Sequence, residues 1–106
     1  MDRIASYSHI IQNYLSEKAS VPFSPGVALK LVVIADTTAH QYILLTVGEQ
    51  KGEKVHSIDI HIAIENEKVV VLLDNTEWNV RKQLEAAGIA REDFIDATQP
   101  LDFIKK

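Results

Sequence analysis

Three polar residues with the chemistry of a catalytic relay occur two positions apart in one stretch of the chain. Ser57 could serve as a nucleophile, His61 as its base and Asp59 as the group that orients the base. Alternate residues of a β-strand are about 6.6 Å apart, whereas a proton relay needs heavy atoms within roughly 3 Å. We therefore interpret the three as ordinary polar residues on one strand face and predict no catalytic residues. A small hydrolase using Asp59 and His61 is the least favoured alternative.

The histidines do not form a convincing metal site. His56 and His61 are separated by an odd number of residues, so a regular strand directs them to opposite faces. Asp59 and His61 would share a face, but they supply two ligands where a stable site has three or four. The chain has no cysteine, and Gly48 and Gly52 are too isolated to form a phosphate-binding loop. We predict neither a bound metal nor a cofactor.

The candidate relay lies in the most strongly patterned part of the sequence, residues 54–78. Four isoleucines alternate there with other residues: Ile58, Ile60, Ile62 and Ile64. This alternation predicts a strand that buries one face. After the polar link Glu65-Asn66-Glu67, a run from Lys68 to Leu73 predicts a second strand, which forms an antiparallel hairpin with the first.

The rest of the chain supplies the elements that pack around this hairpin. Asp2 is the expected N-cap of a helix over 3–18, and strands are expected over 27–36 and 41–48. Asn75 or Thr76 is expected to cap a second helix, which runs to about Ala87 and stops at Gly88. We expect a further helical turn over 90–93, packing of 94–95 against the domain, and a short tail from Thr98.

These elements predict a single α+β domain over residues 1–106. Its four strands would form an antiparallel meander, with the N-terminal and C-terminal helices packed on one face. The first, second and fourth strands are apolar on both faces, so the second face of the sheet also needs a cover. We expect that cover to be a protein partner or an identical chain. The candidate interface residues are Val32, Ile34, Val70, Leu72 and Trp78.

Charge and hydropathy exclude several classes of partner. The formal net charge is −4, with 15 acidic and 11 basic residues. The basic residues are dispersed, whereas proteins that bind DNA or RNA directly usually show a basic patch. No apolar run approaches the length of about 20 residues that spans a bilayer, and the N-terminus is too polar for a signal peptide. We expect a cytoplasmic protein without direct nucleic-acid binding.

Several stretches together resemble the XisI-like proteins, which control excision of the fdxN DNA element in cyanobacteria. The matching features, in order, are Tyr7, Ile10-Ile11 and Leu15; Tyr42-x-Leu44-Leu45-x-Val47-Gly48; His61-Ile62-x-Ile64; Lys68-Val69-Val70-Val71; Asp74-x-Thr76-Glu77; and Ala87-Gly88-Ile89 with Glu92-Asp93. The chain departs from the family pattern at Glu49, Ala63 and Asn75, and Gln99-Pro100-Leu101 replaces the usual His-Pro-Pro segment.

The resemblance implies an accessory protein and not an enzyme. XisI-like proteins act together with a partner, XisH, and XisH-like proteins resemble nucleases of the restriction-enzyme type. The implied function is to bind such a partner and to restrain or direct it during excision of a DNA element. The alternative is a homodimeric factor that associates with DNA directly.

Overall fold

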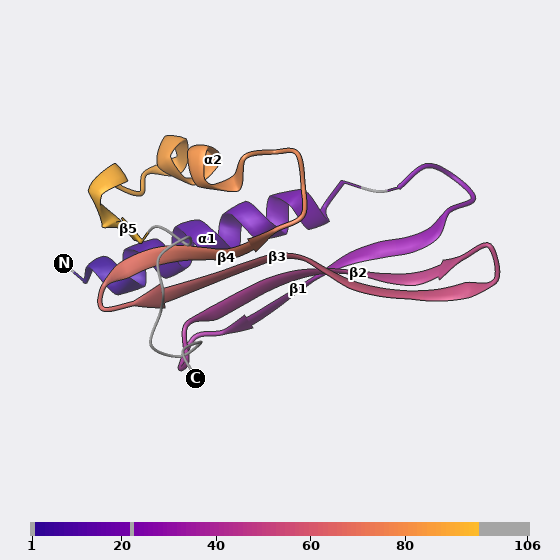
Figure 1. The fold of residues 1–106 in the computed structure, drawn as a ribbon, viewed down its shortest axis with the longest axis horizontal. Coiled ribbons are helices and arrows are strands. Elements are labelled where there is room, and N and C mark those ends of the chain that lie inside the picture. Colours follow the sequence, from indigo (N-terminus) through magenta and orange to yellow (C-terminus); the bar gives the residue numbers. More distant parts are fainter. Residues whose placement is uncertain (1, 22, 96–106) are drawn as a thin grey trace.

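The computed structural model describes residues 2–21 and 23–95, so the tail expected from Thr98 lies outside the described residues. Within these described residues, the fold consists of two α-helices and a five-stranded sheet (Figure 1). The elements are α1 (Arg3–Ala19), β1 (Ala28–Asp36), β2 (Gln41–Gln50), β3 (Glu53–Glu65), β4 (Lys68–Asp74), α2 (Val80–Ala87), a 3-10 turn (Arg91–Asp93) and β5 (Phe94–Ile95).

The sheet differs in one respect from the four-stranded meander that we predicted. Strands β1 to β4 are sequential and antiparallel as expected, but β5 adds a fifth strand that runs parallel to β4. Phe94 pairs with Val69 and Ile95 with Val70. The expected helical turn precedes β5 and is confirmed as the 3-10 turn. A strand of two residues is too short to show a period, so only the return of 94–95 to the domain could be predicted.

The hairpin between β3 and β4 forms without a glycine. Asn66 and Glu67 both adopt positive φ angles, 53° and 64°. Positive φ at both central residues is typical of the type I′ turn, whose twist matches that of the flanking strands. Elsewhere Gly48 is required by sterics, since its φ is 139° and a Cβ would lie 2.0 Å from the carbonyl oxygen of Ala28.

The first helix is confirmed and the start of the second is corrected. The Asp2 carboxylate accepts a hydrogen bond from the Ile4 amide at 3.0 Å and caps α1. The second helix begins at Val80, later than predicted, and its N-cap is Asn79, with φ 57°. The segment 75–78 is a loop because Thr76 bonds to Asp74 instead of to the helix. Trp78 therefore precedes α2, whereas we predicted it inside the first turn.

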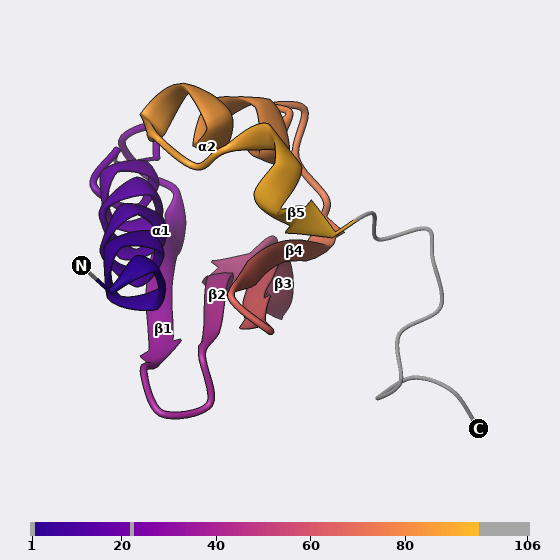
Figure 2. The same ribbon diagram turned by 90° about the vertical axis from the view of Figure 1, so that its left-hand side faces the viewer.

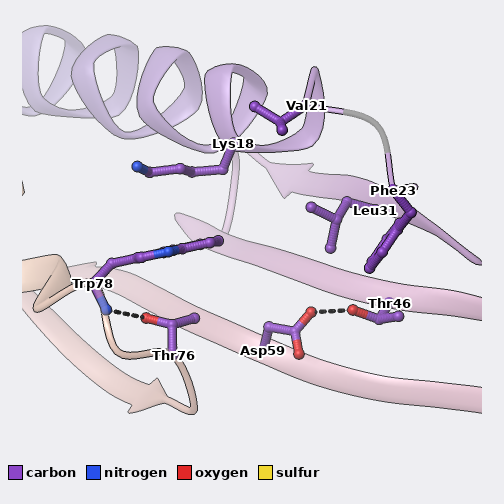
Figure 3. A pocket seen from close by; sticks show the side chains of 8 residues that line it. All are labelled: Lys18, Val21, Phe23, Leu31, Thr46, Asp59, Thr76 and Trp78. Atoms are coloured by element: carbon purple, nitrogen blue, oxygen red, sulfur yellow. Dashed lines mark hydrogen bonds between the residues drawn. The ribbon is translucent and has the colours of Figure 1, made fainter.

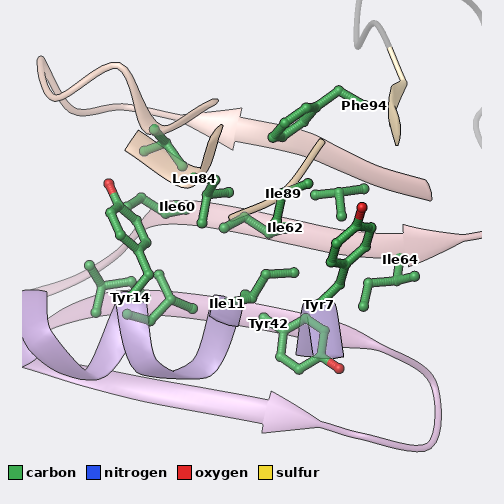
Figure 4. Close-up of a cluster of buried hydrophobic side chains, with 14 residues drawn as sticks. Tyr7, Ile11, Tyr14, Tyr42, Ile60, Ile62, Ile64, Leu84, Ile89 and Phe94 are labelled. Atoms are coloured by element: carbon green, nitrogen blue, oxygen red, sulfur yellow. The ribbon is translucent and has the colours of Figure 1, made fainter. Parts of the chain in front are cut away.

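Both helices pack on the same face of the sheet and enclose the main core (Figures 2 and 4). The core takes one stripe of α1, one of α2 and alternate residues of β2, β3 and β4. Its buried members are Tyr7, Ile11, Tyr14, Leu15, Tyr42, Leu44, Ile60, Ile62, Ile64, Val69, Val80, Leu84, Ile89 and Phe94. Leu31 and Val33 of β1 pack against this cluster from its edge. We call this side of the sheet the helix face and the opposite side the far face.

A buried carboxylate fastens the N-terminal helix to the C-terminal part of the domain. Asp93, 7% exposed, accepts a hydrogen bond of 2.5 Å from the Tyr7 hydroxyl. The guanidinium of Arg3 and the ammonium of Lys68 lie 3.7 Å and 3.9 Å from the same carboxylate. The hydrogen bond to Asp93 and burial raise the pKa of Tyr7, so this phenol keeps its proton at neutral pH. One carboxylate thus joins α1, β4 and the 3-10 turn.

Tyr7→Phe should lower the free energy of unfolding by about 1–2 kcal/mol, because a buried carboxylate loses its neutral donor. Equilibrium unfolding in urea at pH 7 measures the change. Ser8→Ala is the matched control on the same helix, since it removes a buried hydroxyl that bonds to Tyr42. Equal losses in the two variants would show that Asp93 has no special part in fastening α1.

Candidate interaction surfaces

A bulge in β3 decides which side chains lie on each face of the sheet. Leu44 pairs with Ile60, but its neighbour Leu45 pairs with Ile58, so Asp59 is an extra residue in the ladder. Ile60 is completely buried in the main core, whereas Ile58 is 38% exposed. We predicted that Ile58, Ile60, Ile62 and Ile64 would share one face; this is wrong for Ile58, which the bulge turns to the far face.

The bulge also separates the residues of the candidate relay. The Asp59 carboxylate accepts a hydrogen bond from Thr46, which pairs with Leu31 and shares its helix face. His61 instead bonds through Nε2 to the Gln41 amide oxygen at 2.7 Å, on the far face. The prediction that Asp59 and His61 share a face is therefore wrong. Their opposite directions remove the proton relay that a hydrolase would need.

The histidine pair is corrected in the same way. His56 pairs with Val47 and His61 with Ile43, so both lie on the far face and not on opposite faces. Four strand positions still separate them, a distance of about 13 Å. Within residues 2–21 and 23–95, no group of three or more His, Asp or Glu side chains is arranged to hold a metal ion.

The far face carries a continuous apolar patch across β1, β2 and β3. Val32, Leu45 and Ile58 are cross-strand neighbours in one row, and Ile34 and Ile43 adjoin them in the next. Ile34, on the edge strand β1, is 48% exposed. We call these five residues the far-face patch. Burial lowers the pKa of the adjacent His61, so this side chain stays neutral at pH 7.

The five predicted interface residues do not form one surface. Val32 and Ile34 belong to the far-face patch. Val70 is also on the far face but is fully buried beside Ala63, with Leu72 packed against both. Trp78 lies on the helix-face side of the molecule, beside α1.

Trp78 borders an open groove of about 530 Å³ where the end of α1 meets the strands (Figure 3). Trp78 is 39% exposed, and the ammonium group of Lys18 lies over its ring, 4.8 Å from the centroid. Val21 and Phe23 form the apolar wall, and Asp59 with Thr46 forms a polar part of the lining. Cation–π contact fixes the Trp78 ring against α1. The groove is thus a second surface, facing away from the far-face patch.

The loop that carries Trp78 is held by one carboxylate. Asp74 accepts bonds from the Thr76 amide and hydroxyl at 2.9 Å and 2.5 Å and from the Val80 amide at 3.2 Å. The Thr76 hydroxyl oxygen in turn accepts a hydrogen bond of 3.1 Å from the Trp78 amide. Burial alone would raise the pKa of Asp74, but the bonds from Thr76 and Val80 lower it below its ordinary value. Burial, with the charge of Asp74, also raises the pKa of Tyr14 to about 12.

Four members of these surfaces were not predicted from the sequence. Ile58 was assigned to the helix face because a bulge leaves the apolar alternation of the sequence unchanged. Ile43 and Leu45 lie in a strand that is apolar on both sides, which showed that a second face exists but not which residues form it. Lys18 had no signal in the sequence, because its contact with Trp78 spans 60 positions of the chain.

Asp74→Asn should lower the free energy of unfolding by about 1 kcal/mol at pH 7. Thr76 and Val80 donate to different carboxylate oxygens, and asparagine keeps only one acceptor oxygen. The contribution of the carboxylate is complete above the pKa of the unfolded chain and is lost as pH falls through the lowered folded pKa. The wild type should therefore lose stability as pH falls below about 4, and the variant less steeply. Thermal unfolding followed by fluorescence of Trp78, the sole tryptophan, measures both. Parallel pH profiles in the two proteins would contradict this role for Asp74.

No described helix has the length and apolar character needed to cross a membrane.

The fold has close counterparts among solved structures. A XisI-like protein from Anabaena variabilis matches with a TM-score of 0.81 and 25% identity, over 92% of this chain and 88% of that chain. The fdxN element excision controlling factor XisI from the same organism matches with a TM-score of 0.73 and 24% identity, over 93% and 89%. No match was found among curated proteins. The family model for the XisI protein matches residues 1–104, and the chain therefore belongs to the XisI family.

Proposed function

We propose that this chain is a non-enzymatic accessory protein that controls excision of a DNA element by binding a XisH-like protein. Membership of the XisI family and the excision-controlling role of its structural relative support the first part. The far-face patch is the observation that carries the second part. A partner with a nuclease-like fold would be restrained or directed by this contact.

The far-face patch has the character of a protein-binding surface. Its five side chains are aliphatic, adjoin one another across three strands and include two that are more than a third exposed. Polar residues border it, among them Gln41, His56 and Lys30. Apolar patches with a polar rim are typical of interaction sites. Covering an exposed isoleucine contributes about 1–2 kcal/mol to association.

The arrangement of polar groups favours an accessory protein over a hydrolase. Asp59 bonds to Thr46 and His61 to Gln41 on opposite faces of β3, so each has a structural partner and neither can assist the other. Among the described residues, every buried side-chain nitrogen and oxygen has a hydrogen-bond partner. In this part of the chain the buried polar side chains thus support the fold.

Ile58→Glu should weaken the complex with a XisH-like protein from the same organism by about 30-fold or more, because it places a charge among the aliphatic side chains of the patch. Calorimetric titration of the two purified proteins measures the affinity. Val21→Glu is the matched control, because Val21 is 64% exposed in the groove and carries the same change of charge.

Trp78→Ala distinguishes the two surfaces in the same titration. The far-face proposal requires Trp78→Ala and Val21→Glu to bind as the wild type does. Loss of binding in these two, with normal binding by Ile58→Glu, would move the interface to the groove. No complex with the wild-type protein would remove the partner from the proposal.

The isolated protein should bind the DNA of such an element only weakly, with no steep dependence on salt. Its net charge of −4 opposes the phosphate backbone, and release of counterions requires clustered basic groups. Fluorescence anisotropy with labelled duplex at low and high salt measures this. Tight binding that falls steeply with salt would support the alternative of a DNA-associated homodimer.

A further inference from the structure

We propose that a second copy of this chain pairs with β1, antiparallel, so that two sheets join into one across a two-fold axis. The strand order makes β1 the edge of the sheet, and it is nine residues long. At the other edge, β5 has only two residues. In Figure 2, β1 lies at the outer side of the sheet with α1 above it. The proposal concerns the chain alone and does not depend on the partner proposed above.

β1 has few of the features that prevent pairing at a sheet edge. Proteins protect long edge strands with proline, bulges, several charges or a covering element. The sequence Ala28–Asp36 contains no proline, its register with β2 is continuous, and Lys30 is its sole charge before the terminal Asp36. Ile34 projects from it with 48% exposure. Such a strand is suited to accept another strand.

The hydrogen bonds fix which main-chain groups of β1 point outward. The Ile64 amide donates to the His40 carbonyl at 3.1 Å, which makes Gln41 and Ala63 a non-hydrogen-bonded pair. The main-chain groups of Gln41 then point to β1 and bond those of its partner Asp36. By alternation along the continuous ladder, the even-numbered residues of β1 bond to β2. The outward groups belong to Leu29, Leu31, Val33 and Ala35.

These outward groups are compatible with self-pairing in one register centred on Val33. In that register Val33 opposes Val33 of the second copy and Leu31 opposes Ala35, so outward groups meet outward groups. Each such pair exchanges two hydrogen bonds, which gives about six across the two-fold axis. The even-numbered side chains, which lie on the far face, oppose one another in the same register.

The far-face side chains of β1 are self-complementary in this register. In order they are Lys30, Val32, Ile34 and Asp36, with a cation at one end and an anion at the other. Antiparallel pairing places each Lys30 opposite Asp36 of the second copy and each Val32 opposite Ile34. The amides of Thr38 and Ala39 lower the pKa of Asp36, so the anion is present at neutral pH. This match of charge and apolarity selects a second copy over an unrelated strand.

Self-pairing also joins two far-face patches into one. Val32 and Ile34 lie in β1 and are continuous with Leu45 and Ile43 of β2. In the dimer the same residues from the second copy continue the apolar rows across the axis. Part of the exposed surface of Ile34 is covered by Val32 of the other chain. The two copies then present one wider surface to any partner.

Ala35→Pro should raise the dimer dissociation constant by about a hundredfold. Proline removes an outward donor but none of the bonds between β1 and β2, because edge strands tolerate proline at outward positions. Sedimentation equilibrium over a range of concentrations measures the constant, and circular dichroism verifies the fold. Hydrogen exchange gives the register. The amides of Leu31, Val33 and Ala35 should be protected in the wild-type dimer and exchange rapidly in its monomer.

Charge reversal tests the register without proline. Lys30→Glu and Asp36→Lys should each weaken the homodimer by about tenfold. In either variant, residues 30 and 36 of the two copies carry like charges and face each other at both ends of the paired strands. An equimolar mixture should associate as tightly as the wild type, since every pair is again of opposite charge. Ile58→Glu, two strands from the edge, should leave the dimer intact, which separates this proposal from loss of partner binding.

Three results would overturn the proposal. The first is a wild-type chain that is monomeric at every concentration. The second is a dimer that Ala35→Pro leaves intact while the protein stays folded, or one that Ile58→Glu dissociates, because self-association would then use another surface. The third is a monomeric wild-type chain that binds a XisH-like protein, with that binding lost in Ala35→Pro. The edge strand β1 would then be the binding site for that protein and not for a second copy.

Discussion

The register of β3 is the constraint on which the rest of the structure depends. This strand is the middle one of five and the longest, and its isoleucines Ile60, Ile62 and Ile64 are at most 5% exposed in the core. A one-residue slip would expose all three, so the helix face is strongly specified by burial. After the bulge at Asp59, the isoleucines of β3 lie on the helix face. Before the bulge the alternation is shifted by one residue, so Ile58 lies on the far face. The bulge thus places Ile58 in the far-face patch and Asp59 in the groove beside Trp78.

The sequence contains enough information for the helix face but not for the far face. The first helix, its cap at Asp2 and the stop of the second helix at Gly88 were all predicted correctly, because each depends on neighbouring residues. The side of Ile58 depends on a pairing with Leu45, which no local pattern encodes. The same holds for β5, since Phe94 and Ile95 become a strand only by pairing with β4. Contacts between distant segments, and not propensities, determine what could not be predicted.

The start of α2 shows how local signals can compete. Asn75 and Thr76 are good capping residues, and the sequence alone favours them. In the structure Thr76 turns back to Asp74, and Asn79 takes the capping position with a left-handed backbone. The extra loop carries Trp78 to Lys18 on α1. Trp78 therefore lies apart from the far-face residues of our candidate interface, because the helix that was expected to hold it begins at Val80, two residues after it.

Folding does not require the far-face patch to be apolar. The main core is complete on the helix face, and polar side chains on the other side of an antiparallel sheet would be stable in water. Exposed Ile34 and Ile58 instead lower solubility, and Ile34 lies on an edge strand that is able to pair. A relative of known structure retains this fold at 25% identity, so the architecture itself tolerates wide substitution. The apolar character of the far face is thus better explained by association than by stability, and β1 and the patch are the places where association would act.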